Sequence, residues 1–216
     1  MNMFTDRKDA GRRLALKLSK YRGRDALVLT LPRGGVVLGY EIARALSLPL
    51  DIVVVRKVGH PTNPEYAICA VDSTGSLLCN EAEVKPLDQN WLKEEILRQK
   101  QEALRRIEVY RGGQKPAKII GKIIILVDDG IATGLTIHAA IKSIRKECPK
   151  ELVIAVPVAP PEVVKELSKE ADAVFVLDNS QNYLGAVGAY YEYFPQVTDE
   201  EVIELLKRSR NKTFSY

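Results

Sequence analysis

Short apolar runs alternate along the chain with segments in which apolar residues recur every three or four positions. The runs are rich in Val, Ile and Leu and predict buried strands, whereas the three-to-four spacing is typical of amphipathic helices. Strands are expected at residues 26–31, 51–55, 123–127, 152–158 and 173–177. Strands that alternate with helices predict an α/β fold, a mainly parallel β-sheet core flanked by helices on both faces.

The helical segments between these strands have recognisable starts. The first expected helix has Thr5 as N-cap and an apolar stripe of Ala10, Leu14, Leu18 and Tyr21, and two more are expected at 36–46 and 90–110. A fourth follows Thr136 and has a stripe of Ile137, Ile141, Ile144 and Cys148. The last two begin at the pair Pro160–Pro161 and at a capping box of Thr198 and Glu201. Leu92, Ile96, Ala103, Ile107 and Tyr110 share one face of the segment 90–110, which we interpret as a packing helix. Two shorter strands, at 66–71 and 76–79, flank a turn at 73–75.

Composition limits the partners of the chain. The 216 residues suit a single domain. The net charge of +4 comes from dispersed Lys and Arg, so it does not demand a nucleic-acid partner and suits an anionic small ligand equally well. Cys69, Cys79 and Cys148 show no paired spacing, which predicts buried thiols with neither a disulfide framework nor a zinc site. No apolar run approaches the length of a membrane span and the N-terminus lacks a secretory pattern, so we expect a cytoplasmic protein.

The segment 123–136 carries the clearest chemistry. The strand 123–127 leads into Asp128 and Asp129, and the loop that follows is Gly130, Ile131, Ala132, Thr133, Gly134, Leu135 and Thr136. Glycines that expose backbone N–H groups, threonine hydroxyls and a helix N-terminus together form a cradle for a phosphate. Paired carboxylates would repel that phosphate unless they face ribose hydroxyls or a metal ion.

Other interpretations of this segment are weaker. Asp-Asp-Gly alone would be an ordinary turn, but a strand, paired acids and a Thr-Gly-x-Thr loop in register are hard to obtain by chance. The sequence contains neither GxxxxGK[ST] nor GxGxxG, which argues against a Walker-type NTPase and a dinucleotide fingerprint.

The stretch VDDGIATGLT closely resembles the motif with which type I phosphoribosyltransferases bind 5-phosphoribosyl-1-diphosphate (PRPP). Through LPRGGV, VVVRK, NPEYAI and AVGAYY the whole chain is similar to a less characterised branch of that superfamily. The resemblance implies a core at about 24–178, a hood from 1–22 and 179–216, a helical excursion at 88–112, and a homodimer. It also implies that Asp128 and Asp129 meet the ribose hydroxyls, that Ala132 to Thr136 hold the 5′-phosphate, and that Mg²⁺ is bound mainly by the diphosphate, with both aspartates as further candidate ligands.

Two further loops follow strands of the expected core. Arg33, Gly34 and Gly35 suit a diphosphate, although a Gly-Gly turn beside a solvated arginine is common, and the resemblance favours the diphosphate role. Arg56 and Lys57 begin the loop after the strand 51–55. Arg56 is a candidate for PRPP binding, and Lys57 is a candidate catalytic residue beside Asp128 and Asp129. The alternative is that both only form a solvated strand end. Residues 58–72 are expected to be a mobile catalytic loop that excludes water, with His60 as a bystander.

The implied reaction transfers the 5-phosphoribosyl group of PRPP to a nitrogenous base or similar acceptor, with Mg²⁺ as cofactor and release of diphosphate. Ala132 stands where hypoxanthine-guanine enzymes carry an aspartate, so no familiar acceptor is indicated. The aromatic residues Tyr183, Tyr190, Tyr191, Tyr193 and Phe194 suit either stacking on a base or packing of the hood. The alternative function is a non-catalytic regulator that senses PRPP or a nucleotide. Arg12, Arg13, Lys17 and Lys20, the only support for a nucleic-acid-associated role, are interpreted as a solvated helix face.

Overall fold

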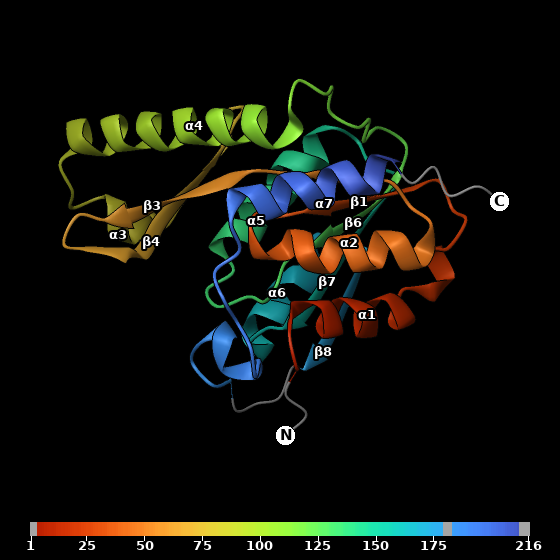
Figure 1. Ribbon diagram of the computed structural model, residues 1–216. Helices are drawn as coiled ribbons and strands as arrows, with labels where there is room; N and C mark the ends of the chain where they lie inside the picture. Colours follow the sequence, from red (N-terminus) through yellow and green to blue (C-terminus); the bar gives the residue numbers. More distant parts are fainter. Residues whose placement is uncertain (1–3, 179–182, 212–216) are drawn as a thin grey trace.

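The core of the protein is a sheet of five parallel strands. The computed structural model describes residues 4–178 and 183–211 (Figure 1). The strands are β1 (Ala26–Thr30), β2 (Leu50–Ile52), β6 (Ile123–Val127), β7 (Glu151–Val158) and β8 (Ala173–Asp178), in the order β2-β1-β6-β7-β8. This confirms the predicted α/β class. The chain winds to one side after β1 and to the other after β6, so the carboxyl ends of β1 and β6 form the topological switch point at which such sheets bind ligands.

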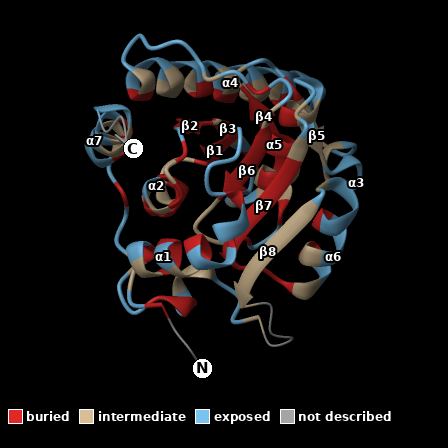
Figure 2. Ribbon diagram, turned by 90° about the vertical axis from the view of Figure 1, so that its right-hand side faces the viewer, coloured by how far each residue is buried: buried red, intermediate tan, exposed pale blue. Residues whose placement is uncertain are grey.

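Helices cover both faces of this sheet (Figure 2). One face packs against α1 (Arg7–Lys17), α2 (Gly34–Leu46) and α7 (Asp199–Asn211), and the other packs against α5 (Leu135–Lys146) and α6 (Pro161–Glu170). Successive strand residues point to opposite faces, so in β6 Ile125 joins the first core while Ile124 joins the second. Both faces are apolar, which explains why the strands are continuous hydrophobic runs in the sequence.

A second, antiparallel sheet projects beside the core. Its strands are β3 (Val55–His60), β4 (Asn63–Asp72) and β5 (Leu77–Cys79), followed by α3 (Glu81–Val84) and the long helix α4 (Gln89–Arg111). The expected single strand 51–55 is wrong, because β2 ends at Ile52 and β3 belongs to the other sheet. The expected loop-rich stretch 58–72 is also wrong, because β3 and β4 form a hairpin whose Val58 and Ile68 are buried in a small core with Leu92 of α4.

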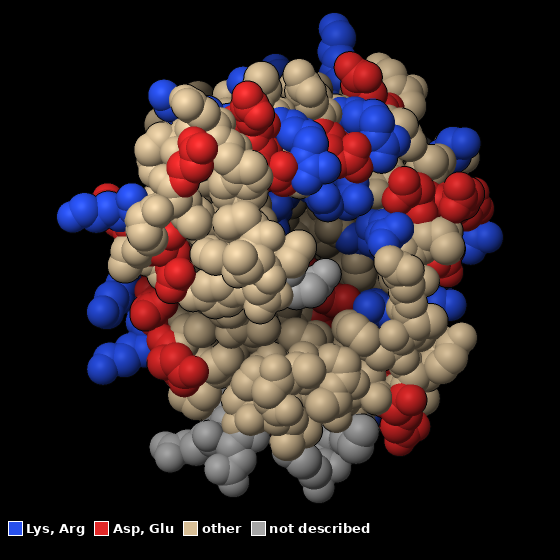
Figure 3. All heavy atoms as spheres, turned by 90° about the vertical axis from the view of Figure 1, so that its left-hand side faces the viewer, with Lys and Arg blue, Asp and Glu red and all other residues tan. Residues whose placement is uncertain are grey.

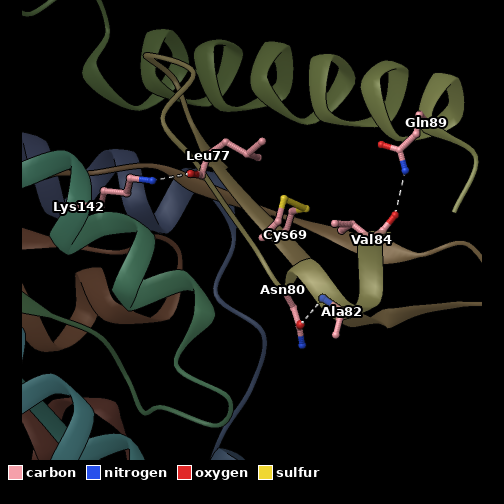
Figure 4. Close-up of a disulfide and its surroundings, with 8 residues drawn as sticks. Cys69, Leu77, Asn80, Ala82, Val84, Gln89 and Lys142 are labelled. Atoms are coloured by element: carbon pink, nitrogen blue, oxygen red, sulfur yellow. Dashed lines mark hydrogen bonds between the residues drawn. A yellow bond between two sulfur atoms is a disulfide. The ribbon is translucent and has the colours of Figure 1, made fainter. Parts of the chain in front are cut away.

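Two local predictions need correction for reasons of geometry. The N-cap of α1 is Asp6, whose carboxylate accepts from the Asp9 amide at 2.7 Å, and not Thr5. The cysteines are not three buried thiols: Cys69 lies opposite Cys79 in the β4–β5 ladder and the two form a disulfide (Figure 4), while Cys148 lies beyond the end of α5 and is exposed. Spacing along the chain does not reveal which residues an antiparallel ladder places side by side.

The two terminal segments meet beside the carboxyl edge of the sheet. Phe4 forms a β-bridge with Tyr191, next to the short helix η2 (Val187–Tyr190), while η1 (Ser19–Tyr21) follows α1. The predicted capping box is present, since Thr198 and Glu201 exchange side-chain to backbone hydrogen bonds at the start of α7. Residues 1–3, 179–182 and 212–216 of the expected hood lie outside the described residues. None of the helices described is both long and apolar enough to cross a membrane.

Candidate active site

Two adjacent carboxylates follow the buried strand β6. The Asp129 amide donates to Asp128 Oδ1 at 2.8 Å, and Asp129 Oδ2 accepts from Arg7 Nε of α1 at 2.7 Å. Both side chains are half-buried. Asp129 is therefore held by a cation from the N-terminal helix and lines one of the two cavities of this site, whereas Asp128 lines both.

Burial controls the protonation of this pair. Burial raises the pKa of Asp128 well above its ordinary value, and the neighbouring Asp129 raises it further, while Lys57 acts in the opposite direction. Burial also raises the pKa of Asp129, and Arg7 counteracts that rise. A ligand that brings hydroxyl groups or a divalent cation to Asp128 supplies the partner that its ionised form lacks.

The predicted phosphate loop opens helix α5. Gly134 is the N-cap residue of α5 with a φ of 79°, a left-handed conformation that favours glycine, and no described side chain caps the helix there. The first amides of α5 therefore remain available to an anion. A cavity of about 300 Å³ lies over this loop and is lined by the acid pair, Lys57, residues 130–134, Thr136 and Ile137, together with Arg7, Val187 and Phe194.

A second, more basic cavity adjoins the first. It measures about 560 Å³ and shares Lys57, Asp128 and Thr136 with its neighbour. Its remaining walls come from the loop after β1, from β3 with Arg56 and His60, and from α4. Figure 3 shows Lys and Arg side chains gathered along the upper rim of a hollow in this face of the molecule. The site thus combines the loop 130–136, the acid pair and an adjoining basic cavity.

The loop after β1 lies beside the site, but its predicted ligands Arg33, Gly34 and Gly35 line neither cavity. It contains a cis peptide bond between Pro32 and Arg33. A Cβ on Gly34 would collide with Asp129 Oδ2, so the backbone at this glycine packs directly against the acid pair. Gly35 is close to the end of β6, while Arg33 Nη1 lies 3.6 Å from Asp199 Oδ1 of α7. Leu135, the first residue of α5, also lines neither cavity.

Several residues of the site were not anticipated from the sequence. Arg7 donates to Asp129 and, through Nη1, to the Pro195 carbonyl at 2.6 Å, and its guanidinium lies 3.6 Å from the centre of the Phe194 ring. The Tyr191 hydroxyl donates to the Asp129 carbonyl at 2.6 Å. These aromatic residues therefore pack and position the acid pair, and Tyr190 and Tyr191 are buried.

Arg7 of α1 and the unexpected residues Gln99 and Arg106 of α4 share one sequence signal, a polar side chain on an otherwise apolar helix face. Arg7 shares a helix face with the buried Ala10 and Leu14 of α1. Gln99 and Arg106 share a face with the buried Ala103 of α4. A polar residue on an otherwise apolar helix stripe needs a partner in the folded protein. This rule would have identified Arg7, Gln99 and Arg106 from the sequence.

Comparison with known proteins agrees with this architecture. The family model described as the phosphoribosyl transferase domain matches residues 2–193. The chain belongs to the phosphoribosyl transferase family. Its structure superimposes with a TM-score of 0.79 on TT1426 from Thermus thermophilus, which is 43% identical, over 95% of this chain and 98% of that one.

Two curated relatives from Mycobacterium tuberculosis extend the comparison. They are proposed phosphoribosyl transferases, MT0597 of strain CDC 1551 and Rv0571c of strain H37Rv, and each is 39% identical over 211 residues. The match covers 97% of this chain and 47% of either relative, so the chain spans about half their length. The family and the sheet architecture predicted from the sequence are thereby confirmed.

Proposed function

We propose that this phosphoribosyl transferase family member moves the 5-phosphoribosyl group of PRPP to a nitrogenous base or a similar acceptor and releases diphosphate, with Mg²⁺ as cofactor. One observation carries the proposal: the acid pair and the phosphate loop line a single cavity that opens into a cationic one. PRPP carries a ribose between a monophosphate and a diphosphate, so it needs carboxylates for the ribose hydroxyls with a phosphate-binding loop on one side and cations on the other.

The ligand is assigned to the site group by group. The 5′-phosphate binds the backbone amides of 132–136 and the hydroxyls of Thr133 and Thr136, and the ribose hydroxyls bind Asp128 and Asp129. The diphosphate lies toward Arg56 and Lys57, which line the larger cavity. Arg33, Gly34 and Gly35 lie beside the acid pair and would reach the diphosphate only from the edge of this arrangement.

The donor set fits a magnesium ion that the substrate shares. Asp128 offers a carboxylate oxygen toward the cavities, whereas Asp129 is committed to Arg7. Mg²⁺ is a small, strongly hydrated cation that proteins usually hold through one or two carboxylates together with substrate phosphates. The ion would supply positive charge to the leaving diphosphate.

The charges of the site match the polarity of the reaction. As the C1–O bond breaks, positive charge develops on the ribose, near the two aspartates, and negative charge develops on the leaving oxygen. Lys57 lines both cavities and lies where the ribose and the diphosphate would join, so its ammonium group is placed to stabilise the leaving oxygen. Fixed charges of this kind act most strongly in a site that excludes water.

The experiment is a calorimetric titration with PRPP, with and without Mg²⁺. We expect micromolar binding that depends on Mg²⁺ and is lost in Asp128→Asn/Asp129→Asn. Asp25→Asn, a control at an exposed carboxylate far from the site, should bind as the wild type does. Equal binding by the wild type and the double variant would refute the assignment.

Catalysis and ligand sensing share this site and differ in turnover. The loop 130–136 contains only Gly, Ile, Ala, Thr and Leu, so it offers an acceptor no carboxylate base, which is the observation that favours the sensing alternative. Release of diphosphate in the presence of a panel of nucleobases supports catalysis, and binding without release supports the sensor. The cytoplasmic location and the homodimer expected from the sequence stay predictions.

A further inference from the structure

Helix α4 turns a polar face toward the larger cavity. Gln99 and Arg106 lie on the same face as the buried Ala103, and both line the cavity opposite Asp128 and Thr136. Packing alone would place apolar residues at these positions, because the rest of the stripe is apolar. The helix is therefore more than a packing element.

Gln99 holds a cation of the cavity without neutralising it. Its Oε1 accepts from Arg56 Nε at 3.1 Å, and its Nε2 donates to Glu95 at 2.8 Å. Glu95 is itself paired with Arg98 by two hydrogen bonds. Arg56 is thus oriented by a neutral amide. Burial lowers the pKa of Arg56, the nearby Arg106 lowers it further, and Glu102 acts in the opposite direction.

Arg106 brings a second guanidinium to the same place. Its Nε donates to Glu102 at 2.8 Å, but Glu102 also binds Arg105 through two hydrogen bonds, so one carboxylate serves two cations. Arg105 is 53% exposed and does not line this cavity, whereas Arg106 is 19% exposed and does. Arg56 has a neutral amide as its partner and Arg106 shares its carboxylate, so both guanidinium groups can still bind an anion from outside the chain.

We infer that α4 forms the outer wall of the diphosphate site, in which Arg106 contacts the phosphate farther from the ribose and Gln99 positions Arg56 against it. This inference rests on the proposed function and deepens it by assigning a ligand role to a helix outside the loops that follow the strands of the core. A diphosphate has the high charge density that two adjacent guanidinium groups bind through paired hydrogen bonds.

Calorimetry with two separate probes tests the inference on the full chain. Inorganic diphosphate with Mg²⁺ reports the α4 side, and ribose 5-phosphate reports the phosphate loop. Arg106→Gln should weaken diphosphate binding about 10- to 100-fold and leave ribose 5-phosphate binding unchanged, because a charge-assisted hydrogen bond is lost on one side only. Arg105→Gln, which touches the same Glu102 from outside, is the matched control and should bind both probes as the wild type does.

A second variant keeps the test decisive if Arg106→Gln does not fold. Gln99→Glu preserves size and gives Arg56 an internal carboxylate, so diphosphate should bind about tenfold more weakly while ribose 5-phosphate is unaffected. Unchanged diphosphate binding in the folded variants, or equal losses in Arg105→Gln and Arg106→Gln, would overturn the inference. A wild type that binds ribose 5-phosphate but not diphosphate also overturns it, whereas a wild type that binds neither probe refutes the proposed function itself.

Discussion

Replacing Arg7 by Met measures how strongly the N-terminal helix holds the acid pair. The wild-type guanidinium contacts three groups from distant parts of the chain: Asp129 Oδ2 at 2.7 Å, the Pro195 carbonyl at 2.6 Å and the face of the Phe194 ring. Methionine keeps the apolar contact with the ring and removes both hydrogen bonds and the charge. The change therefore isolates the polar part of the interaction.

The expected loss of stability follows from the burial of the pair. Removing one partner of a buried ion pair costs about 3–5 kcal/mol, because the other charge stays buried without compensation. The side chains of Arg7 and Asp129 are 10% and 18% exposed, so water can replace little of what is lost. At about 2–4 °C per kcal/mol for a chain of this size, Tm should fall by roughly 6–20 °C.

The loss should depend on pH with a definite sign. Arg7 holds down a pKa of Asp129 that burial raises, so in Arg7→Met this pKa rises further. As the pH falls through that raised pKa, the carboxyl takes up a proton and no longer needs a cation. The difference in unfolding free energy between wild type and variant should therefore be larger at pH 8 than at pH 5.

Urea denaturation at both pH values is the measurement. Arg13→Met serves as the control: Arg13 pairs with Asp9 on the same helix but is 40% exposed, so water can replace the lost partner and the change should cost less than about 1 kcal/mol. In Asp129→Asn, the Arg7 substitution should cost much less than in the wild type, because the two residues are coupled. A loss that is small, independent of pH or unchanged in the Asp129→Asn background would refute this account of the acid pair.

Three further predictions concern the acid pair and the second sheet. Asp128→Asn should raise the Tm of the ligand-free protein at pH 7.5, and the gain should disappear near pH 4. The reason is that ionising a buried carboxyl in the folded protein costs about 1.4 kcal/mol for each unit by which its pKa is raised. Mg²⁺ and PRPP should no longer add stability to this variant. Gly34→Ala should abolish PRPP binding in calorimetry, since its Cβ would displace the Asp129 carboxylate, and wild-type affinity would contradict the close approach. Reduction of the Cys69–Cys79 disulfide should cost about 2–3 kcal/mol in urea denaturation, and Cys79→Ser should reproduce that cost and be insensitive to reductant.

The core was predictable from the sequence because its signals are local. The run 123–127 is apolar on both faces, and Gly134 and the threonines follow at the spacing of a strand-to-helix turn, so strand, acids and phosphate loop could be predicted together. The structure brings Asp128, Lys57 and Thr136 to the same cavities, although their chemical roles stay predictions.

The remaining features depend on contacts between segments far apart in the chain. The break between Ile52 and Val55 assigns neighbouring residues to different sheets, which a continuous apolar run conceals. The Cys69–Cys79 pairing depends on strand register, and the Arg7–Asp129 pair joins residues 122 positions apart in the sequence. Of these contacts, only the Arg7–Asp129 pair leaves a trace in the sequence, because Arg7 is a polar residue on a buried helix stripe.

The antiparallel sheet beside the site changes the entropy of any closure over the ligand. Ordering a free segment the length of residues 58–72 would cost roughly 1–2 kcal/mol per residue in backbone entropy alone. In this protein most of that stretch is already hydrogen-bonded in β3 and β4 and packed beneath α4, so folding of the chain has fixed it before any ligand arrives. For the proposed substrate PRPP, closure by a rigid hairpin would leave more of the binding free energy for the orientation of the ribose and the exclusion of water.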